Sequence, residues 1–297
     1  MSAASPTAES SAGPKRKASG RALGLRFASG VVLVPFLLGV AYFGTPGSIG
    51  GMVYGLLIAA ASGFAAFELR QMLRSGGYRP LTFVLVGVSI LLPLDAWLRP
   101  AAPPVIAVDG VLIVEVAALL GLVALLVRRS VDRALLDWAL SLALALYIGG
   151  LMQFYMPLRS VASPVPGFWV IALLVLSWVC DSSAYFVGGA YGRRRLAPLI
   201  SPAKSVEGAV AGVTFTPLVA ALLSLPAQQP PLLLVGYGLI IALATIVGDL
   251  AESLIKRQTG VKDSGVLIPG HGGLLDRMDS LLFCAPVAVL YLHAFAA

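Results

Sequence analysis

Charged side chains are scarce in this sequence. Asp, Glu, Lys and Arg make up 12% of the 297 residues, whereas ordinary globular domains contain about 25%. Hydrophobic residues account for 58%. Because so few charges are available to form a hydrated surface, the composition argues against a soluble protein. It predicts an all-α polytopic membrane protein.

Cysteine and histidine are also rare, with two of each. Cys180 and Cys284 both lie in apolar stretches, where a thiol usually behaves as a small buried hydrophobic group. We therefore expect no disulfide, metal site or redox chemistry from them. The chain shows no pattern typical of a Ser-His-Asp triad, a zinc cluster or a dinucleotide-binding fold.

Long apolar runs dominate what is present. Runs of about 17–25 residues are long enough to cross the hydrocarbon core of a bilayer as helices. The sequence predicts about nine transmembrane helices, at 27–43, 51–67, 81–98, 105–127, 135–157, 166–187, 208–225, 232–250 and 278–296.

Residues 1–26 precede the first run and are rich in Ser, Ala, Gly and Pro. This composition is typical of a disordered tail, which we expect in the cytoplasm. A signal peptide is the alternative, but no convincing small-residue cleavage site follows the first apolar run.

The basic residues indicate the orientation of the chain. The net charge is +7, and of the 21 Lys and Arg residues all but Arg99 and Arg159 fall in alternate connections on one side. Positive residues gather on the cytoplasmic side of membrane proteins. The pattern predicts a cytoplasmic N-terminus, a C-terminus outside and a multi-pass protein of the cell inner (plasma) membrane. It points to membrane topology and not to a nucleic-acid partner.

The character of the chain changes near residue 165. Before it the connections are short, whereas 188–207 and 250–277 are long, charged and rich in glycine. We therefore divide the chain into a transmembrane scaffold, 27–165, and a C-terminal transmembrane domain, 166–297, in which we expect the chemistry to lie.

A polar island from Asp249 to Asp279 separates the uncharged stretches 208–248 and 280–297. A charge near the bilayer centre costs roughly 2.5–3.5 kcal/mol on insertion scales, so such clusters are usually functional. On a helix, Asp249, Ser253 and Lys256 share one stripe at i, i+4 and i+7. A solvated helix end with snorkelling cations is the structural alternative.

The segment 259–273 contains five glycines together with Lys262 and His271. Backbone N–H groups in a Gly-rich turn can bind an anion, and Lys262 would add a positive charge. We expect a phosphate site, although the segment matches neither a P-loop nor a dinucleotide fingerprint. An ordinary surface loop is the alternative.

Asp276 and Asp279 open the last predicted span at i and i+3, on one face of its first turn. Carboxylates suit Mg²⁺, which commonly binds through one or two of them plus substrate phosphates. Together with Asp249 they predict a metal site across two helices. Interaction of the aspartates with the helix dipole is the alternative.

The earlier connection, from Asp181 to Gly208, carries Lys204, Ser205 and Glu207 beside a span entrance. It predicts a second phosphate-binding segment. The neighbouring Arg193, Arg194 and Arg195 are explained by topology alone.

These residues resemble the signature of the phosphatidate cytidylyltransferase family, also called CDP-diacylglycerol synthases. The similarity covers a 27-residue pattern from Ser253 to Asp279 and extends upstream to Asp181. It departs from the family pattern at Gly189 and on either side of Lys204. In the first half the chain is similar only as a multi-span segment.

The resemblance implies cytidylyl transfer from CTP to phosphatidic acid, giving CDP-diacylglycerol and pyrophosphate, within a membrane of lipids. It implies Mg²⁺, which K⁺ can accompany, and it suggests a homodimer. The implied catalytic residues are Asp249, Asp276, Asp279, Lys256 and Arg257, of which the three aspartates would bind the metal. The implied substrate-binding residues are Ser253, Lys262, Asp263, His271, Gly272, Gly273, Arg277, Lys204, Ser205, Glu207 and Asp181.

Three other functions remain open. A transporter could use Asp109, Asp181 and Asp249 along an ion path, although the charged connections lie on one side. Another lipid enzyme, such as a polyprenol kinase or an enzyme that uses CDP-alcohols, is a closer alternative. The CDP-alcohol element DGxxAR is absent, because Asp109-Gly110 is followed by Val-Leu-Ile-Val. A catalytically idle lipid-binding relative is the third.

Overall fold

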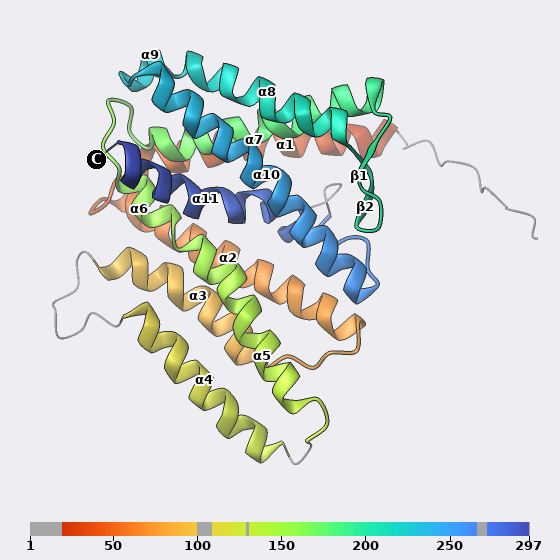
Figure 1. The fold of residues 1–297 in the computed structure, drawn as a ribbon. Coiled ribbons are helices and arrows are strands. Elements are labelled where there is room, and N and C mark those ends of the chain that lie inside the picture. Colours follow the sequence, from red (N-terminus) through yellow and green to blue (C-terminus); the bar gives the residue numbers. More distant parts are fainter. Residues whose placement is uncertain (1–19, 100–108, 129–130, 266–271, 297) are drawn as a thin grey trace, which may run out of the picture.

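The computed structural model describes residues 20–99, 109–128, 131–265 and 272–296, and these residues are mostly helical (Figure 1). The longer helices are α1 (Gly20–Phe43), α2 (Ile49–Ser75), α3 (Thr82–Leu98), α4 (Gly110–Val127), α5 (Ala134–Ala145), α7 (Phe168–Tyr191), α8 (Val206–Leu222), α10 (Pro231–Thr259) and α11 (Leu275–Phe295). The shorter ones are the π-helix η2 (Leu146–Gly150), α6 (Tyr155–Ser160) and α9 (Ser224–Ala227).

Among the residues that the structure describes, six helical stretches are long and apolar enough to cross a membrane: α2, α4, the stretch Ala134–Ser160, α7, α10 and α11. Shorter apolar helices cover Val31–Phe43, Thr82–Leu98 and Val206–Leu222. The chain is therefore an integral membrane protein. The count of nine spans, the cytoplasmic N-terminus and the external C-terminus stay predictions.

Several helix boundaries differ from those expected; α2, for example, ends at Ser75 and not at residue 67. Helix α10 continues beyond residue 250 to Thr259, where Gly260 ends it in the left-handed conformation with φ 72°. Gly is the usual residue in this position because it has no Cβ to clash. Helix α1 begins at Gly20, inside the expected tail 1–26, of which residues 1–19 lie outside the described part.

The helices form two groups that meet along the middle of the molecule (Figure 1). In one, α3 packs against α2, α4 and α5; in the other, α8 packs against α7 and α10, and α10 packs against α11. The core of the second group contains Trp169 and Tyr237, whose rings meet edge to face at 5.3 Å. The Tyr237 hydroxyl donates to the Trp169 carbonyl at 2.9 Å, so this buried polar group is satisfied.

A short hairpin corrects the all-α expectation. Strand β1 (Arg195–Ala197) pairs antiparallel with β2 (Ser201–Ser205) in the connection between α7 and α8. The pairing satisfies backbone groups that an open loop would leave to solvent. Ser205 then caps α8, because its Oγ accepts from the Gly208 N–H at 3.1 Å.

The stretch that contains α5, η2 and α6 is interrupted by the π-helix η2. A Cβ on its Gly149 would lie 2.5 Å from Ser89 Cα, so glycine is required for this close approach to α3. Such π-helical turns are frequent at functional sites.

Candidate active site

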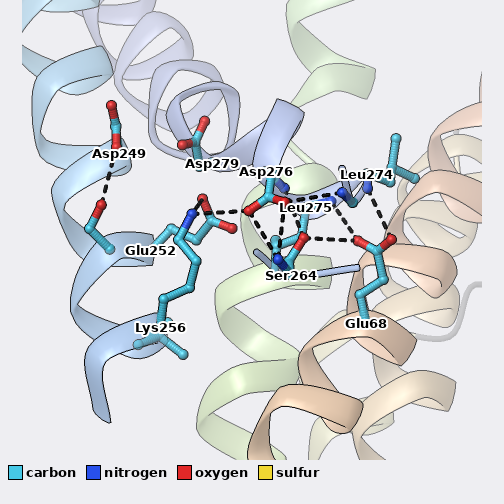
Figure 2. Close-up of polar contacts among 12 residues, drawn as sticks. Glu68, Asp249, Glu252, Lys256, Ser264, Leu274, Leu275, Asp276 and Asp279 are labelled. Atoms are coloured by element: carbon cyan, nitrogen blue, oxygen red, sulfur yellow. Dashed lines mark hydrogen bonds and ion pairs between the residues drawn. The ribbon is translucent and has the colours of Figure 1, made fainter. Parts of the chain in front are cut away.

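Several described residues of the polar island form a cluster between α10 and α11 (Figure 2). The Lys256 ammonium lies at its centre, 3.0 Å from Asp276 Oδ1 and 3.2 Å from Glu252 Oε2. Glu252 is fully buried and Asp276 is largely buried. The two helices are thus joined by a shared cation.

Asp276 organises the loop that precedes its own helix. Its Oδ2 accepts from the backbone N–H groups of Ser264 and Gly273, both at 3.0 Å. Gly272 has φ 83°, a left-handed conformation in which glycine is strongly favoured. Two backbone N–H groups of the Gly-rich segment thus donate to an anionic oxygen of the chain's own Asp276. Binding of a substrate phosphate by this segment stays a prediction.

Glu68 of α2 completes the cluster, and its role was not apparent from the sequence. Its carboxylate accepts from the N–H groups of Leu274 at 3.0 Å and Leu275 at 2.8 Å, and from Ser264 Oγ at 3.3 Å (Figure 2). A lone glutamate near the end of an apolar run indicates no more than the edge of a span. The first group of helices is therefore not a plain scaffold.

Asp249 lies one turn before Ser253 on α10. Its carboxylate pairs with Lys204, which the hairpin presents from strand β2, and accepts from Ser253 Oγ at 3.3 Å. The predicted stripe is correct for Asp249 and Ser253. Lys256, the third member, instead turns to Glu252 and Asp276.

Two further aspartates lie within electrostatic reach of this group. Asp181 of α7 interacts with the charges of Asp279, Asp249, Lys204 and Arg277. Asp279 accepts from the Ser280 N–H at 2.6 Å and interacts with the charge of Asp249.

Tyr147, on the π-helix η2, is a second contribution from the first group of helices that sequence reasoning missed. Its hydroxyl lies within reach of the charges of Glu252 and Asp279. The π-helical turn therefore directs a polar group toward the cluster, as the frequency of such turns at functional sites would suggest.

The donor set can be compared with the needs of a metal ion. Among the described residues, no group of three or more Asp, Glu, His or Cys side chains is close enough to hold one. Asp249 and Asp276 are each paired with a lysine. The chemistry nevertheless fits a hard cation: Glu252 is buried and neither of its oxygens accepts a hydrogen bond of good geometry. Nearby negative charges and oxygen donors are what Mg²⁺ prefers. The metal roles of Asp249, Asp276 and Asp279 stay predictions.

The remaining predicted residues are placed as follows. Arg257 Nε donates to the Ile200 carbonyl at 3.0 Å and so ties α10 to the hairpin. Glu207 accepts from the backbone N–H groups of Arg193 at 3.0 Å and Arg194 at 3.2 Å, and Ser205 is buried as the cap of α8. Lys262, Asp263 and Arg277 are exposed, Gly273 is buried, and His271 lies outside the described residues.

Comparison with known proteins identifies the family. The model of the cytidylyltransferase family matches residues 24–295. A phosphatidate cytidylyltransferase of Bacillus subtilis is 36% identical over 258 residues, which cover 84% of this chain and 91% of that protein. One from Synechocystis is 31% identical over 287 residues, which cover 87% of this chain and 94% of that protein. One from Haemophilus influenzae is 45% identical over 127 residues, which cover 40% of this chain and 43% of that protein.

The match extends over both groups of helices, including α2, which carries Glu68, and α10 and α11, which carry the Lys256 cluster. The resemblance seen from Ser253 to Asp279 is thereby confirmed. The chain belongs to the cytidylyltransferase family and is a nucleotidyltransferase embedded in a membrane.

Proposed function

We propose that this protein is a phosphatidate cytidylyltransferase, which converts CTP and phosphatidic acid into CDP-diacylglycerol and pyrophosphate. The observation that carries the proposal is the cluster around Lys256, where the signature residues of α10 and α11 meet. Two relatives with this name cover more than four fifths of the chain.

The reaction forms one bond and breaks one. A phosphate oxygen of phosphatidic acid attacks the α-phosphorus of CTP, and the bond from that phosphorus to the bridging oxygen of the β-phosphate breaks. Pyrophosphate leaves with the electron pair. A phosphate monoester is already an anion near neutral pH, because its second pKa is about 6. The attack therefore needs no strong general base, and no histidine has to supply one.

The protein's own cations would bind the negatively charged substrates. Lys256 of α10 lies at the centre of the cluster and contacts Asp276, and Lys204 of β2 contacts Asp249. We assign them to the phosphates of CTP, together with Arg257, Lys262 and Arg277 near the cluster. Fixed cations stabilise the charge that develops on the phosphoryl oxygens during the transfer.

Asp249, Asp276 and Asp279 are the residues that would hold Mg²⁺, which when bound would neutralise phosphate charge and orient the reacting groups. Asp249 stays close to Lys204 and Ser253, and Asp276 is fixed by backbone N–H groups of the loop. The carboxylates are therefore oriented by the chain itself.

Topology supports the same function. The charged connections 188–207 and 250–277 belong to the side that the positive residues mark as cytoplasmic. CTP would reach this side from water and phosphatidic acid from the inner leaflet. A site at these helix ends would let the two phosphates meet.

The test uses the full chain in liposomes that contain phosphatidic acid, with labelled CTP and Mg²⁺. We expect labelled CDP-diacylglycerol from the wild type, loss of turnover with a chelator and recovery with added Mg²⁺. Asp249→Asn and Asp276→Asn should each abolish turnover while the protein stays folded in detergent. Asp95→Asn is the matched control, because Asp95 pairs with Arg99 at the end of α3. A folded wild type that makes no labelled lipid, or near-normal turnover in either site variant, contradicts the proposal.

A further inference from the structure

We propose that Glu68 is a positioning residue of the active site, which holds the start of α11 and the loop at Ser264 so that Asp276 faces Lys256. The kinetic part of this inference rests on the proposed function. The structural part, a clamp supplied by α2 to α11, can be tested without it.

The first observation is that α11 has no cap of its own. The residue before its first turn is Leu274, whose side chain cannot accept a hydrogen bond. The first N–H groups of a helix need acceptors from outside the helix. Glu68 supplies them across 206 residues of sequence: Oε1 accepts from Leu274 N–H at 3.0 Å and Oε2 from Leu275 N–H at 2.8 Å. Its negative charge also suits the positive end of the helix dipole.

The second observation is a short relay from Glu68 to Asp276 through Ser264. Ser264 Oγ donates to Glu68 Oε2 at 3.3 Å and accepts from the Asp276 N–H at 3.2 Å. The Ser264 N–H in turn donates to the Asp276 carboxylate at 3.0 Å. Ser264 thus holds Asp276 at both backbone and side chain, and Glu68 fixes the rotamer of Ser264.

The third observation concerns two glycines of the loop. A Cβ on Gly265 would lie 2.5 Å from Glu68 Oε1, and a Cβ on Gly273 would lie 2.7 Å from Glu68 Oε2. Both distances are shorter than real carbon–oxygen contacts. The loop therefore leaves the space that a buried carboxylate from α2 occupies, and Glu68 is only 6% exposed there.

These contacts place Glu68 behind Asp276 and not in contact with the Lys256 ammonium (Figure 2). A residue in this place controls the direction of a catalytic carboxylate without touching substrate. Loss of such a supporting partner typically lowers activity by about 10–100-fold. The reason is that a displacement of a reacting group by about 1 Å can lower the rate by about 100-fold.

The test compares Glu68→Gln with Tyr54→Phe in the full chain. Tyr54 is a matched control: it is buried on the same helix, and its hydroxyl donates to the Tyr155 carbonyl at 3.0 Å at the other end of α2. We expect Glu68→Gln to lower kcat by about 10–100-fold, with KM for CTP close to that of the wild type. Tyr54→Phe should keep kcat even if it melts earlier. Glu68→Gln with the kcat of Tyr54→Phe overturns the inference.

Hydrogen exchange provides a readout that needs no turnover. The amides of Leu274, Leu275 and Asp276 should exchange at least about tenfold faster in Glu68→Gln than in Tyr54→Phe, because the glutamine amide has one acceptor oxygen where the carboxylate has two, and it carries no negative charge. Unchanged exchange overturns the clamp even if the enzyme is active. An inactive wild type with faster exchange in Glu68→Gln contradicts the proposed function and leaves the clamp supported.

A second variant covers the case in which Glu68→Gln does not fold. Gly265→Ala keeps the glutamate but pushes its carboxylate away from Leu274. It should reproduce both the fall in kcat and the faster exchange. Wild-type values of both in Gly265→Ala overturn the inference.

Discussion

Lys256 Nζ lies 3.0 Å from Asp276 Oδ1, so an ion pair joins α10 to the first turn of α11. The same ammonium is 3.2 Å from the fully buried carboxylate of Glu252. One cation therefore compensates two acidic groups, and both the stability of the helix pair and the geometry of the site depend on it.

Replacing Lys256 should affect stability and turnover together. Lys256→Met leaves Glu252 and Asp276 without their cation, and breaking a buried pair in this way typically costs about 3–5 kcal/mol. We expect a lower melting temperature in detergent and a more than roughly 100-fold loss of cytidylyl transfer, since the variant loses the cation that we assign to a phosphate of CTP. Lys256→Arg should recover most of the stability.

Arg74→Met is the control for Lys256, because Arg74 is exposed in the last turn of α2. Arg74→Met should change neither the melting temperature nor the cytidylyl transfer appreciably. A Lys256→Met protein with the melting temperature and turnover of Arg74→Met would show that the ion pair has no role.

Gly273→Ala tests the packing of the signature loop. The added methyl group would overlap Ser264 Oγ, so the loop must shift. Overpacking of this kind costs about 1–3 kcal/mol, and turnover should fall with it. Gly87→Ala on α3 is the control, because nothing lies within 4 Å of its new methyl group. The melting temperature and the turnover of Gly273→Ala are compared with those of Gly87→Ala. If the two variants have the same melting temperature and turnover, this account of Gly273 is refuted.

Ser205 was predicted to bind substrate, and in the structure it caps α8. Ser205→Ala should cost about 0.5–2 kcal/mol and Ser205→Gly only a few tenths, since glycine is tolerated at a cap. If Ser205 also contacts a substrate phosphate, both variants should raise KM for CTP alike. Unfolding measurements combined with KM values separate the two roles, and a KM unchanged in both variants removes Ser205 from the substrate site.

The predicted topology can be checked by labelling introduced cysteines. Ser75, at the end of α2, should lie in the cytoplasm, and Ala162, between α6 and α7, outside; both are exposed. A membrane-impermeant thiol reagent added to intact cells should label Ala162→Cys and not Ser75→Cys. The native Cys180 and Cys284 are buried and provide a low background. Labelling of Ser75→Cys and not of Ala162→Cys would show that the chain has the opposite orientation in the membrane.

Most of what depends on local spacing was predictable from the sequence. Ser253 does contact Asp249 at i−4, as the helical spacing predicts. Apolar runs of sufficient length located the helices because a bilayer demands them. The ion pair between Lys256 and Asp276 was not predicted, because we expected the carboxylates of the two helices to hold a metal.

Long-range relationships were not predictable in the same way. Glu68 meets Ser264 across 196 residues, and nothing in the pattern of an isolated glutamate identifies its partner. The hairpin was also missed, because its strands are too short to show a period. Lys204 reaches Asp249 only because this hairpin exists.

Lys204 is paired with Asp249 and Lys256 with Asp276, so each of these lysines has its counter-ion within the chain. An ammonium without a counter-ion is expensive to remove from water. The folded protein therefore needs no bound anion to balance these two positive charges.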